Sequence, residues 1–324
     1  MSSVQGSPVV SITVVVYNSD RSLRRCLSSV RHLVLQGFAQ LIVVDNASPD
    51  HSARIVAEEF PEVTLLCSET NRGFAGGCNL AWPRVRGRYW LLLNPDVSVP
   101  RGGLEGLVEW MDAHSRLGAA SPELVDEAGN PACAGRRFQS LTRTLLEMSR
   151  LHLLLPRRRR AELFLGSYWT GDRDHLDVDF VPGTAMIVRR EVVKMVGLLS
   201  ESLPMYGEDT EWCWRIRKAG WRIGVCSALR FRHDEGESAI RTWGETDRRG
   251  RMWRGIYASC ARMRGSAYCR MLMVANAVAF AIETLHPWRT PEQRAQSRKH
   301  LHAHATLLRR RSPGSQGTRT TVVQ

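Results

Sequence analysis

The first hundred residues alternate between two hydrophobic periods, and this alternation constrains the fold more than any other feature of the chain. Uncharged apolar runs, typical of strands buried on both faces, occupy residues 9–16, 41–44, 63–66 and 89–93. After the first run, residues 21–35 place apolar side chains at helical spacing. Strand–helix alternation with short connections builds right-handed βαβ units. The sequence therefore predicts an α/β domain with a mainly parallel central sheet and helices on both faces.

The rest of the chain is less regular. We expect helices from residues 48–50 through Phe60, near 78–85, over 102–114 and over 211–218, and strands at 185–188 and 223–226. Residues 130–175 include four consecutive arginines, 157–160, and no clear strand, so loop and helix with some mobility are expected there. From residue 241 the pattern is helical and arginine-rich.

Polar side chains follow the predicted strands. Asp45 and Asn46 come after the second strand, Asn71 lies before a glycine-rich turn, and Asp96 follows the fourth strand. Ligands of parallel sheets bind beyond the carboxyl ends of the strands. A carboxylate at position 45 can accept from a base N–H or a ribose hydroxyl. Turn chemistry is an equally good explanation of this segment and of the glycine-rich turn.

The segment NPD (94–96) suits a hard cation. Magnesium binds through one or two carboxylates together with substrate phosphates and waters, so Asp96 alone would suffice beside a nucleoside diphosphate. The alternative is a proline-containing turn in which Asp96 caps the next helix. His233, in RHDEGES (232–238), follows the last predicted strand and can act as a ligand or donate to a diphosphate.

The segment GEDTEWCWR (207–215) concentrates Glu208, Asp209 and Glu211 at the start of a predicted helix. One of these carboxylates is a candidate general base. Helix capping and the helix dipole are the alternative explanation. Trp212 and Trp214 could form an apolar wall that raises the pKa of a carboxylate, and Trp214 could equally belong to the core.

The net charge of +13 is unevenly distributed: residues 241–324 hold 16 Lys and Arg against 4 Asp and Glu, and residues 1–240 hold 29 against 28. A basic segment of this kind favours anionic lipid headgroups, nucleic acid or phosphorylated substrates. The apolar run 271–285 is interrupted by Asn276 and Glu283 and is shorter than the roughly 20 residues of a membrane span. It is expected to form a buried or interfacial helix.

Eight scattered cysteines without a CxxC pair indicate reduced thiols in a cytosolic protein. The early apolar run lacks the basic flank of a secretory signal.

Seven ordered segments resemble the bacterial glycosyltransferase family 2 pattern, and within it the rhamnosyltransferases of cell-surface polysaccharides. They are VVVYNS, VVDNASPD, NRGFAGGCN, LLLNPDV, FVPGTAMIVRR, YGEDTEWCWR and RHDEGES. The resemblance covers about residues 10–238 and implies a GT-A fold with an inverting mechanism. Residues 1–240 would form the catalytic domain, 241–308 a basic helical extension and 309–324 a disordered tail.

The resemblance also implies a role for each matching residue. Asp209 would be the catalytic base, supported by Glu208, and Trp212 would face the acceptor sugar. Asp96 and His233 would hold Mg²⁺ or Mn²⁺. The donor nucleotide sugar would be bound by Tyr17, Asn18, Asp45, Asn71, Gly73, Asn79, Asn94 and Gly183. Asn94 replaces the first acid of the family's DxD motif, which weakens the expected metal site.

These roles predict transfer of L-rhamnose from dTDP-rhamnose to a polyprenyl-diphosphate-linked saccharide, by an enzyme on the cytoplasmic face of the plasma membrane. The basic C-terminal helices, with Trp253, Tyr257 and Trp288, would dock on that membrane. A UDP-hexose donor is one alternative. A nucleic-acid-binding protein is another, although the basic segment has no RNA-binding signature, and no nucleic-acid partner is expected. A catalytically inactive family member, suggested only by Asn94, is a third.

Overall fold

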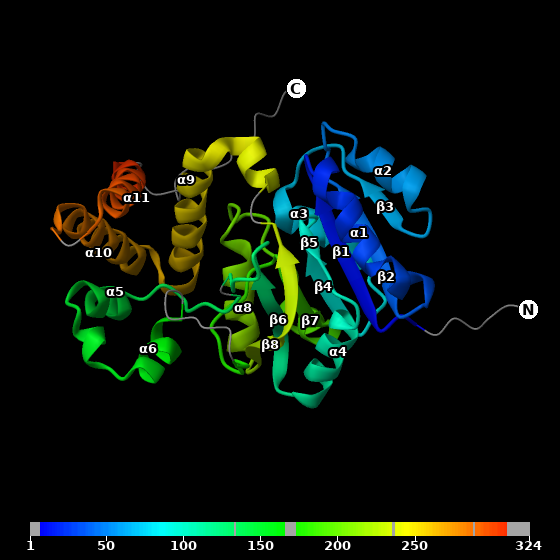
Figure 1. The fold of residues 1–324 in the computed structure, drawn as a ribbon, viewed down its shortest axis with the longest axis horizontal. Coiled ribbons are helices and arrows are strands. Elements are labelled where there is room, and N and C mark those ends of the chain that lie inside the picture. The colour runs from blue at the N-terminus through cyan, green and yellow to red at the C-terminus, as the bar shows by residue number, and fades with distance from the viewer. Residues whose placement is uncertain (1–6, 133, 166–172, 235–236, 288, 310–324) are drawn as a thin grey trace, which may run out of the picture.

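The computed structural model describes residues 7–132, 134–165, 173–234, 237–287 and 289–309, with the backbone alone for 237–247. Its centre is an eight-stranded sheet in the order β3-β2-β1-β4-β7-β6-β8-β5 (Figure 1). The strands are β1 Val10–Val16, β2 Ala39–Asp45, β3 Thr64–Cys67, β4 Tyr89–Leu93, β5 Val97–Ser98, β6 Leu117–Val125, β7 Ala185–Arg189 and β8 Arg222–His233.

The sheet is parallel on one side and mixed on the other. Strands β3, β2, β1 and β4 pair in parallel, as the sequence predicts. Strand β7 then runs antiparallel between β4 and β6, whereas β6 and β8 are parallel and β5 closes the edge antiparallel to β8. The carboxyl ends of β1, β2 and β4 therefore meet at one edge of the sheet.

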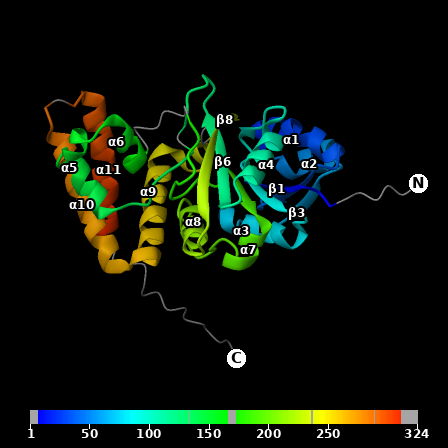
Figure 2. The same ribbon diagram turned by 90° about the horizontal axis from the view of Figure 1, so that it is seen from below.

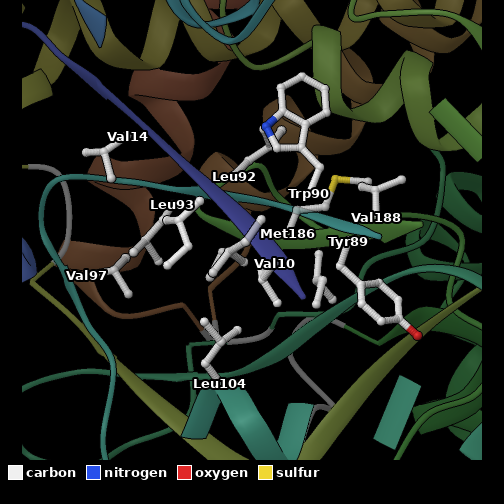
Figure 3. Packing of buried hydrophobic residues seen from close by; sticks show 14 of the residues in the cluster. Val10, Val14, Tyr89, Trp90, Leu92, Leu93, Val97, Leu104, Met186 and Val188 are labelled. Atoms are coloured by element: carbon white, nitrogen blue, oxygen red, sulfur yellow. The ribbon is translucent and has the colours of Figure 1, made fainter. Parts of the chain in front are cut away.

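Six helices and one 3₁₀ turn belong to this α/β domain: α1 Asp20–Leu35, α2 Ser52–Glu59, α3 Gly73–Ala81, η1 Trp82–Arg84, α4 Gly103–Ala113, α7 Arg190–Val196 and α8 Glu208–Lys218. The core between helices and sheet is apolar and dense. Figure 3 shows Trp90, Leu92 and Met186 within it. The indole N–H of Trp90 is satisfied by Thr13 Oγ1 at 2.8 Å.

Several boundaries differ from those predicted. The nine residues of β6 read LGAASPELV, and their Gly, Ser, Pro and Glu hide a strand that is buried throughout. Helix α3 begins at Gly73, five residues before the expected start, and α8 begins at Glu208 instead of Glu211. Strand β8 continues past Cys226 to His233. In each case tertiary pairing or packing extends an element beyond its local hydrophobic signal.

The remaining helices form a second body, which we call the helical module: α5 Leu141–Met148, η2 Leu151–Leu154, α6 Arg157–Phe164, α9 Glu237–Arg264, α10 Ser266–Leu285 and α11 Pro291–Arg309. Helix α10 packs against α5, α9 and α11. Both views place α9 between the other module helices and the sheet (Figures 1 and 2). The expected disordered tail lies outside the described residues, apart from Arg309 at the end of α11.

The module has its own core, built on Trp253, Tyr257, Cys260, Cys269 and Leu272. Trp253 and Tyr257 are 8% and 4% exposed. The prediction that these two aromatic side chains contact a membrane is therefore wrong. They are packed against α10 and α11, where Tyr257 meets His304. Trp288 lies outside the described residues.

Candidate active site

Asp45 ends β2 directly beside the end of β1. It pairs in register with Val16, and the next two residues of β1's exit turn are Tyr17 and Asn18. Asp45 Oδ1 is buried and has no hydrogen-bond partner, and burial raises the pKa of this carboxyl. An unpartnered buried acceptor costs about 1–3 kcal/mol, so the position suits an oxygen that a ligand would satisfy.

The two exit turns are tied to each other. The backbone N–H of Asn18 donates to Ser48 Oγ at 2.7 Å, and the N–H of Asp20 donates to Asp50 Oδ2 at 2.9 Å. Burial alone would raise the pKa of Asp50, but hydrogen bonds from Ser48, Asp20 and Ser52 lower it to about 2. Asn18 and Ala47 both adopt positive φ, 57° and 58°. Strained backbone of this kind is concentrated at functional sites.

Asn46 holds the glycine-rich turn in place. Its Nδ2 donates to Asn71 Oδ1 at 3.0 Å and to the Gly73 carbonyl at 3.1 Å, and its Oδ1 accepts from the Arg72 N–H. The turn therefore lies beside Asp45. Sequence reasoning noticed Asn46 at the sheet edge and assigned it no role.

Asn79 does not line this turn. Its amide donates to the Leu199 carbonyl and to Glu201 Oε1, both at 2.9 Å. Asn79, which the resemblance implies supports this loop, connects α3 to the segment 199–201, and Glu201 of that segment also pairs with Arg72 of the turn at 3.0 Å.

Asp96 and His233 are brought together by the β5–β8 pair, in which Val97 lies opposite His233. His233 Nε2 is 3.4 Å from Asp96 Oδ1. Asp96 is 5% exposed, and its Oδ1 is buried without a hydrogen bond. Within the described part of the chain there is no group of three or more His, Cys, Asp or Glu placed to hold a metal. The donor set fits a divalent cation that takes its remaining oxygens from a diphosphate and water.

Asp209, in the first turn of α8, is half-buried and held from two sides. Its Oδ2 accepts from the Gly183 N–H at 3.1 Å and its Oδ1 from the Thr210 N–H at 2.6 Å. Gly183 is also packed closely, because a Cβ at this position would lie 2.6 Å from the ring of Phe74 in α3. The Gly183 backbone thus joins α8 to the glycine-rich turn.

Glu208 lies beside Asp209 and is more deeply buried, at 5% exposure. Its Oε2 accepts from the Gly207 N–H at 2.8 Å. Burial, followed by the charge of Asp209, raises the pKa of Glu208 to about 8. Burial also raises the pKa of Asp209, but its bonds from Gly183 and Thr210 oppose this. Two adjacent carboxyls whose pKa values are both raised favour a pair that holds one proton near neutral pH.

Two backbone groups connect the acids of this edge. The N–H of Asn94, the residue after β4, donates to the Thr184 carbonyl at 2.8 Å, and the adjacent Gly183 holds Asp209. The predicted site residues near β4, β7 and α8 are therefore neighbours.

Trp212 does not belong to the exposed part of the site. It has 0% exposure, its Nε1 donates to the Gly197 carbonyl at 2.8 Å, and its ring packs edge-on against Trp90 at 5.9 Å. The expectation that Trp212 faces an acceptor sugar is therefore wrong. One turn after Glu208, this face of α8 points into the core.

An α/β fold whose strand ends bring together an orphaned acid, an acid–histidine pair and a positioned carboxylate is that of a glycosyltransferase with the predicted GT-A architecture. The model of glycosyl transferase family 2 matches residues 11–197, more than half of the chain. The chain belongs to this family.

Relatives cover most of the chain at low identity. An N-acetylglucosaminyl-diphospho-decaprenol L-rhamnosyltransferase of Mycobacterium tuberculosis is 25% identical over 256 residues, covering 72% of this chain and 78% of the relative. A low-salt glycan biosynthesis hexosyltransferase of Haloferax volcanii is 23% identical over 235 residues, covering 70% and 67%. The solved structure of a mannosyltransferase from Pyrobaculum calidifontis, in complex with GDP-Man and Mn²⁺, aligns with a TM-score of 0.59 at 17% identity, covering 94% of this chain and 87% of that one. This similarity supports the fold.

Proposed function

We propose that the protein is an inverting, divalent-metal-dependent transferase that moves L-rhamnose from dTDP-rhamnose to a hydroxyl of a polyprenyl-diphosphate-linked saccharide. The observation that carries this proposal is the link between two acids through neighbouring backbone groups. These acids are Asp96, whose buried Oδ1 lies near His233 and accepts no hydrogen bond, and Asp209, held by Gly183. The donor and acceptor are suggested by the mycobacterial relative, whose name specifies a rhamnosyltransferase acting on a decaprenyl diphosphate.

Asp209 is the proposed base. Its carboxylate accepts the proton of the acceptor hydroxyl, and that oxygen forms a bond to the anomeric carbon from the face opposite the nucleotide. The bond between the anomeric carbon and the phosphate oxygen breaks, and the nucleoside diphosphate leaves with the electron pair. Protonated Glu208 keeps a second negative charge away from the base. A cation held by Asp96 and His233 would neutralise charge growing on the leaving diphosphate.

The residues proposed to bind the donor lie at the carboxyl ends of the parallel strands. Tyr17, Asn18 and Asp45 lie on the two linked exit turns, where a nucleoside would satisfy Asp45 Oδ1. Gly73 opens α3 with a φ of 70°, and its N–H donates to Asn71 Oδ1 at 2.9 Å. The positive end of the α3 dipole, which faces the sheet edge, suits a phosphate. Asn94 and Gly183 are linked to Asp209 through the backbone, because the Asn94 N–H donates to the Thr184 carbonyl and the Gly183 N–H donates to Asp209.

A donor panel tests the reaction. The purified full-length chain is heated with dTDP-rhamnose, UDP-glucose, UDP-galactose or UDP-GlcNAc, with and without Mn²⁺, and transfer to a short polyprenyl-diphosphate GlcNAc acceptor is measured. We expect the largest Mn²⁺-dependent rise in Tm and transfer of inverted configuration with dTDP-rhamnose. A selective response to one UDP-sugar would replace the proposed donor, and retention of anomeric configuration would reject the mechanism.

We also propose that the enzyme works at the cytoplasmic face of the plasma membrane, docked through the helical module. Helix α10 presents an exposed apolar face of Met271, Val274, Val278, Ile282 and Leu285, each 45% to 82% exposed. Within the described residues, α10 is the one helix long and apolar enough to cross a membrane by length and composition. The expectation that this run is too short for a span is corrected, because the helix begins at Ser266 and has 20 residues.

Neighbouring elements extend this face. Leu151, Leu153 and Leu154 of η2 are exposed, and η2 packs beside α5, which packs on α10. The exposed arginines 157–159 follow directly. Leucines bordered by arginines suit an interfacial surface with anionic lipid headgroups.

Vesicle flotation tests the docking. The full-length chain should float with phosphatidylglycerol-containing vesicles and much less with neutral ones. The double variant Val278→Asp/Ile282→Asp should lose flotation, whereas Leu35→Asp, at a 68% exposed leucine of α1, should retain it. Equal flotation of all three proteins would contradict the proposal, and resistance to alkaline carbonate would indicate a membrane span instead of surface docking.

A further inference from the structure

Helix α9 lies directly on the loop that precedes the catalytic carboxylates. A Cβ on Gly207 would lie 2.4 Å from the Gly255 carbonyl oxygen, and a Cβ on Gly255 would lie 2.3 Å from the Met205 carbonyl oxygen. Only glycines allow this backbone contact. Figure 1 shows α9 alongside α8 and the sheet. The helical module is thus fixed to the α/β domain one residue before Glu208.

The helical period identifies which side chains of α9 share the face of Gly255. Residues seven apart on a helix lie nearly above one another, about 10 Å apart along the axis. Arg262, seven residues after Gly255, does face α8: its Nε is 3.7 Å from Glu211 Oε1 and its guanidinium donates to Ser202 Oγ at 3.1 Å. Arg248, seven residues before Gly255, lies on the same face of α9.

Tyr206 lies at the centre of this contact, because a Cβ on Gly255 would be 2.9 Å from the Tyr206 carbonyl carbon. Tyr206 is half-buried and adopts a φ of 74°, a strained value for a side-chain-bearing residue. Burial raises the pKa of its hydroxyl. The charge of Arg248 opposes this rise, and the charges of Glu208, Asp96 and Asp209 add to it. Tyr206 is therefore within electrostatic range of Arg248 and of the three acids of the site.

Arg248 is half-buried, and within the described residues it forms no ion pair or hydrogen bond. Other arginines of this interface have partners, as Arg262 does. A partly desolvated guanidinium without an anion, beside a hydroxyl donor, matches the geometry that binds phosphate oxygens bidentately.

We propose that Arg248 and the Tyr206 hydroxyl form a diphosphate-binding subsite, which α9 brings to the catalytic acids. The inference rests on the proposed function, in which two substrates carry a diphosphate: the nucleotide donor and the lipid-linked acceptor. The subsite makes the helical module part of the active site in addition to its role as an anchor.

The test compares Arg248→Gln, Arg248→Lys and Tyr206→Phe with Arg254→Gln, which removes the same charge from an exposed position of α9. Binding of UDP and dTDP is measured with Mn²⁺, and the KM for polyprenyl-diphosphate GlcNAc is measured at saturating donor. Removing a charged hydrogen bond should weaken binding of the affected substrate by about 10- to 100-fold. Arg248→Lys should recover part of this loss, and Arg254→Gln should match the parent protein.

The two measurements separate the sources of the phosphate. Weaker nucleotide binding assigns the subsite to the donor, and a higher acceptor KM with unchanged nucleotide binding assigns it to the acceptor. If Arg248→Gln equals Arg254→Gln in both, or if its only effect is a lower Tm that Arg248→Lys restores, the inference is overturned. The proposed function fails separately, when the parent protein binds nucleotide but transfers no sugar.

Discussion

The sheet edge and the helical module both bury polar groups, but the two regions differ in whether those groups are hydrogen-bonded. At the sheet edge, Asp45 Oδ1 and Asp96 Oδ1 are buried without a hydrogen bond. In the module, the Tyr257 hydroxyl meets His304 Nε2 at 2.6 Å and accepts from Asn276 Nδ2 at 2.8 Å, and Asn276 Oδ1 accepts from Thr144 at 3.1 Å.

Whether a buried polar group has a hydrogen-bond partner distinguishes groups that bind a ligand from groups that hold the fold. A satisfied buried network specifies one packing of its helices, since any shift leaves a polar group without a partner. Unsatisfied acids lower stability and are retained where a ligand completes them. Substitutions at the sheet edge should therefore reduce activity without loss of stability, and those in the module network should do the reverse.

The largest effect is expected for Asp209→Asn. The amide oxygen can still accept from Gly183, but the amide NH2 then faces the Thr210 N–H and cannot take a proton. The kcat should therefore fall by about 10²- to 10⁴-fold, with only a small loss of Tm and nearly unchanged nucleotide binding. Steady-state transfer and thermal unfolding measure the two. Asp126→Asn, in an exposed turn where the carboxylate bonds Asn130, is the matched control. A fully active Asp209→Asn protein would remove the base from the mechanism.

Asp96→Asn should weaken Mn²⁺-dependent nucleotide binding by at least about tenfold, because the amide is a poor cation ligand. Its Tm without ligand should stay the same or rise, since a buried charge is removed. Calorimetric titration of UDP and dTDP with and without Mn²⁺ measures the first quantity. A lower Tm with unchanged nucleotide affinity would mean that Asp96 stabilises the fold, as Tyr257 does, and does not bind the ligand.

Tyr257→Phe should show the opposite pattern. It leaves Asn276 Nδ2 and His304 Nε2 without their partner, so the free energy of unfolding should fall by about 1–3 kcal/mol, while nucleotide affinity stays the same. Urea unfolding measures the loss. Tyr268→Phe is the milder control, because that hydroxyl is half-exposed and water can replace its bond from the Leu141 N–H. A stable Tyr257→Phe protein would show that the network is dispensable.

The sequence correctly predicts that Asp45 and Asp96 follow strands that end at the same edge of the sheet, and the reason is local. Asp45 and Asp96 directly follow apolar runs whose strand character is clear, and parallel pairing then brings the strand ends together. The prediction for Trp212 is wrong because the residues next to it in the sequence do not indicate which face of α8 packs on the sheet. Strand β6 is missed by the sequence prediction because its burial arises from pairing with β7 and β8, not from hydrophobic composition.

Residues that depend on contacts between distant segments are harder still. Tyr206 and Arg248 are 42 positions apart in the sequence, and only the glycine contact between α9 and the catalytic loop relates them. Positive φ at Tyr206 has no signature in its residue type. The fold of the first hundred residues can therefore be predicted largely from periodicity, whereas the proposed contribution of the module to the site cannot.

The smallest effects concern pH, and they should have opposite signs in the two regions. In the module, burial and the charge of Arg249 lower the pKa of His300 from 6.5 to about 4. The unfolded chain binds this proton first as the pH falls, so the stability contributed by neutral His300 is present above pH 6.5 and is lost towards pH 4. His300→Gln should reduce this acid-side loss.

At the sheet edge the pH dependence of stability has the opposite sign. Burial and Asp209 raise the pKa of Glu208 from 4.5 to about 8, so the folded protein holds a proton that the unfolded chain releases. Its stability contribution is complete below pH 4.5 and is lost as the pH rises towards 8. Glu208→Gln carries no titrating proton and can still accept from Gly207. Its Tm should therefore equal that of the parent near pH 5 and exceed it increasingly up to pH 8, by thermal unfolding at constant ionic strength. A difference that shrinks with rising pH would mean that Glu208 is the ionised member of the pair, and the base would have to be reassigned.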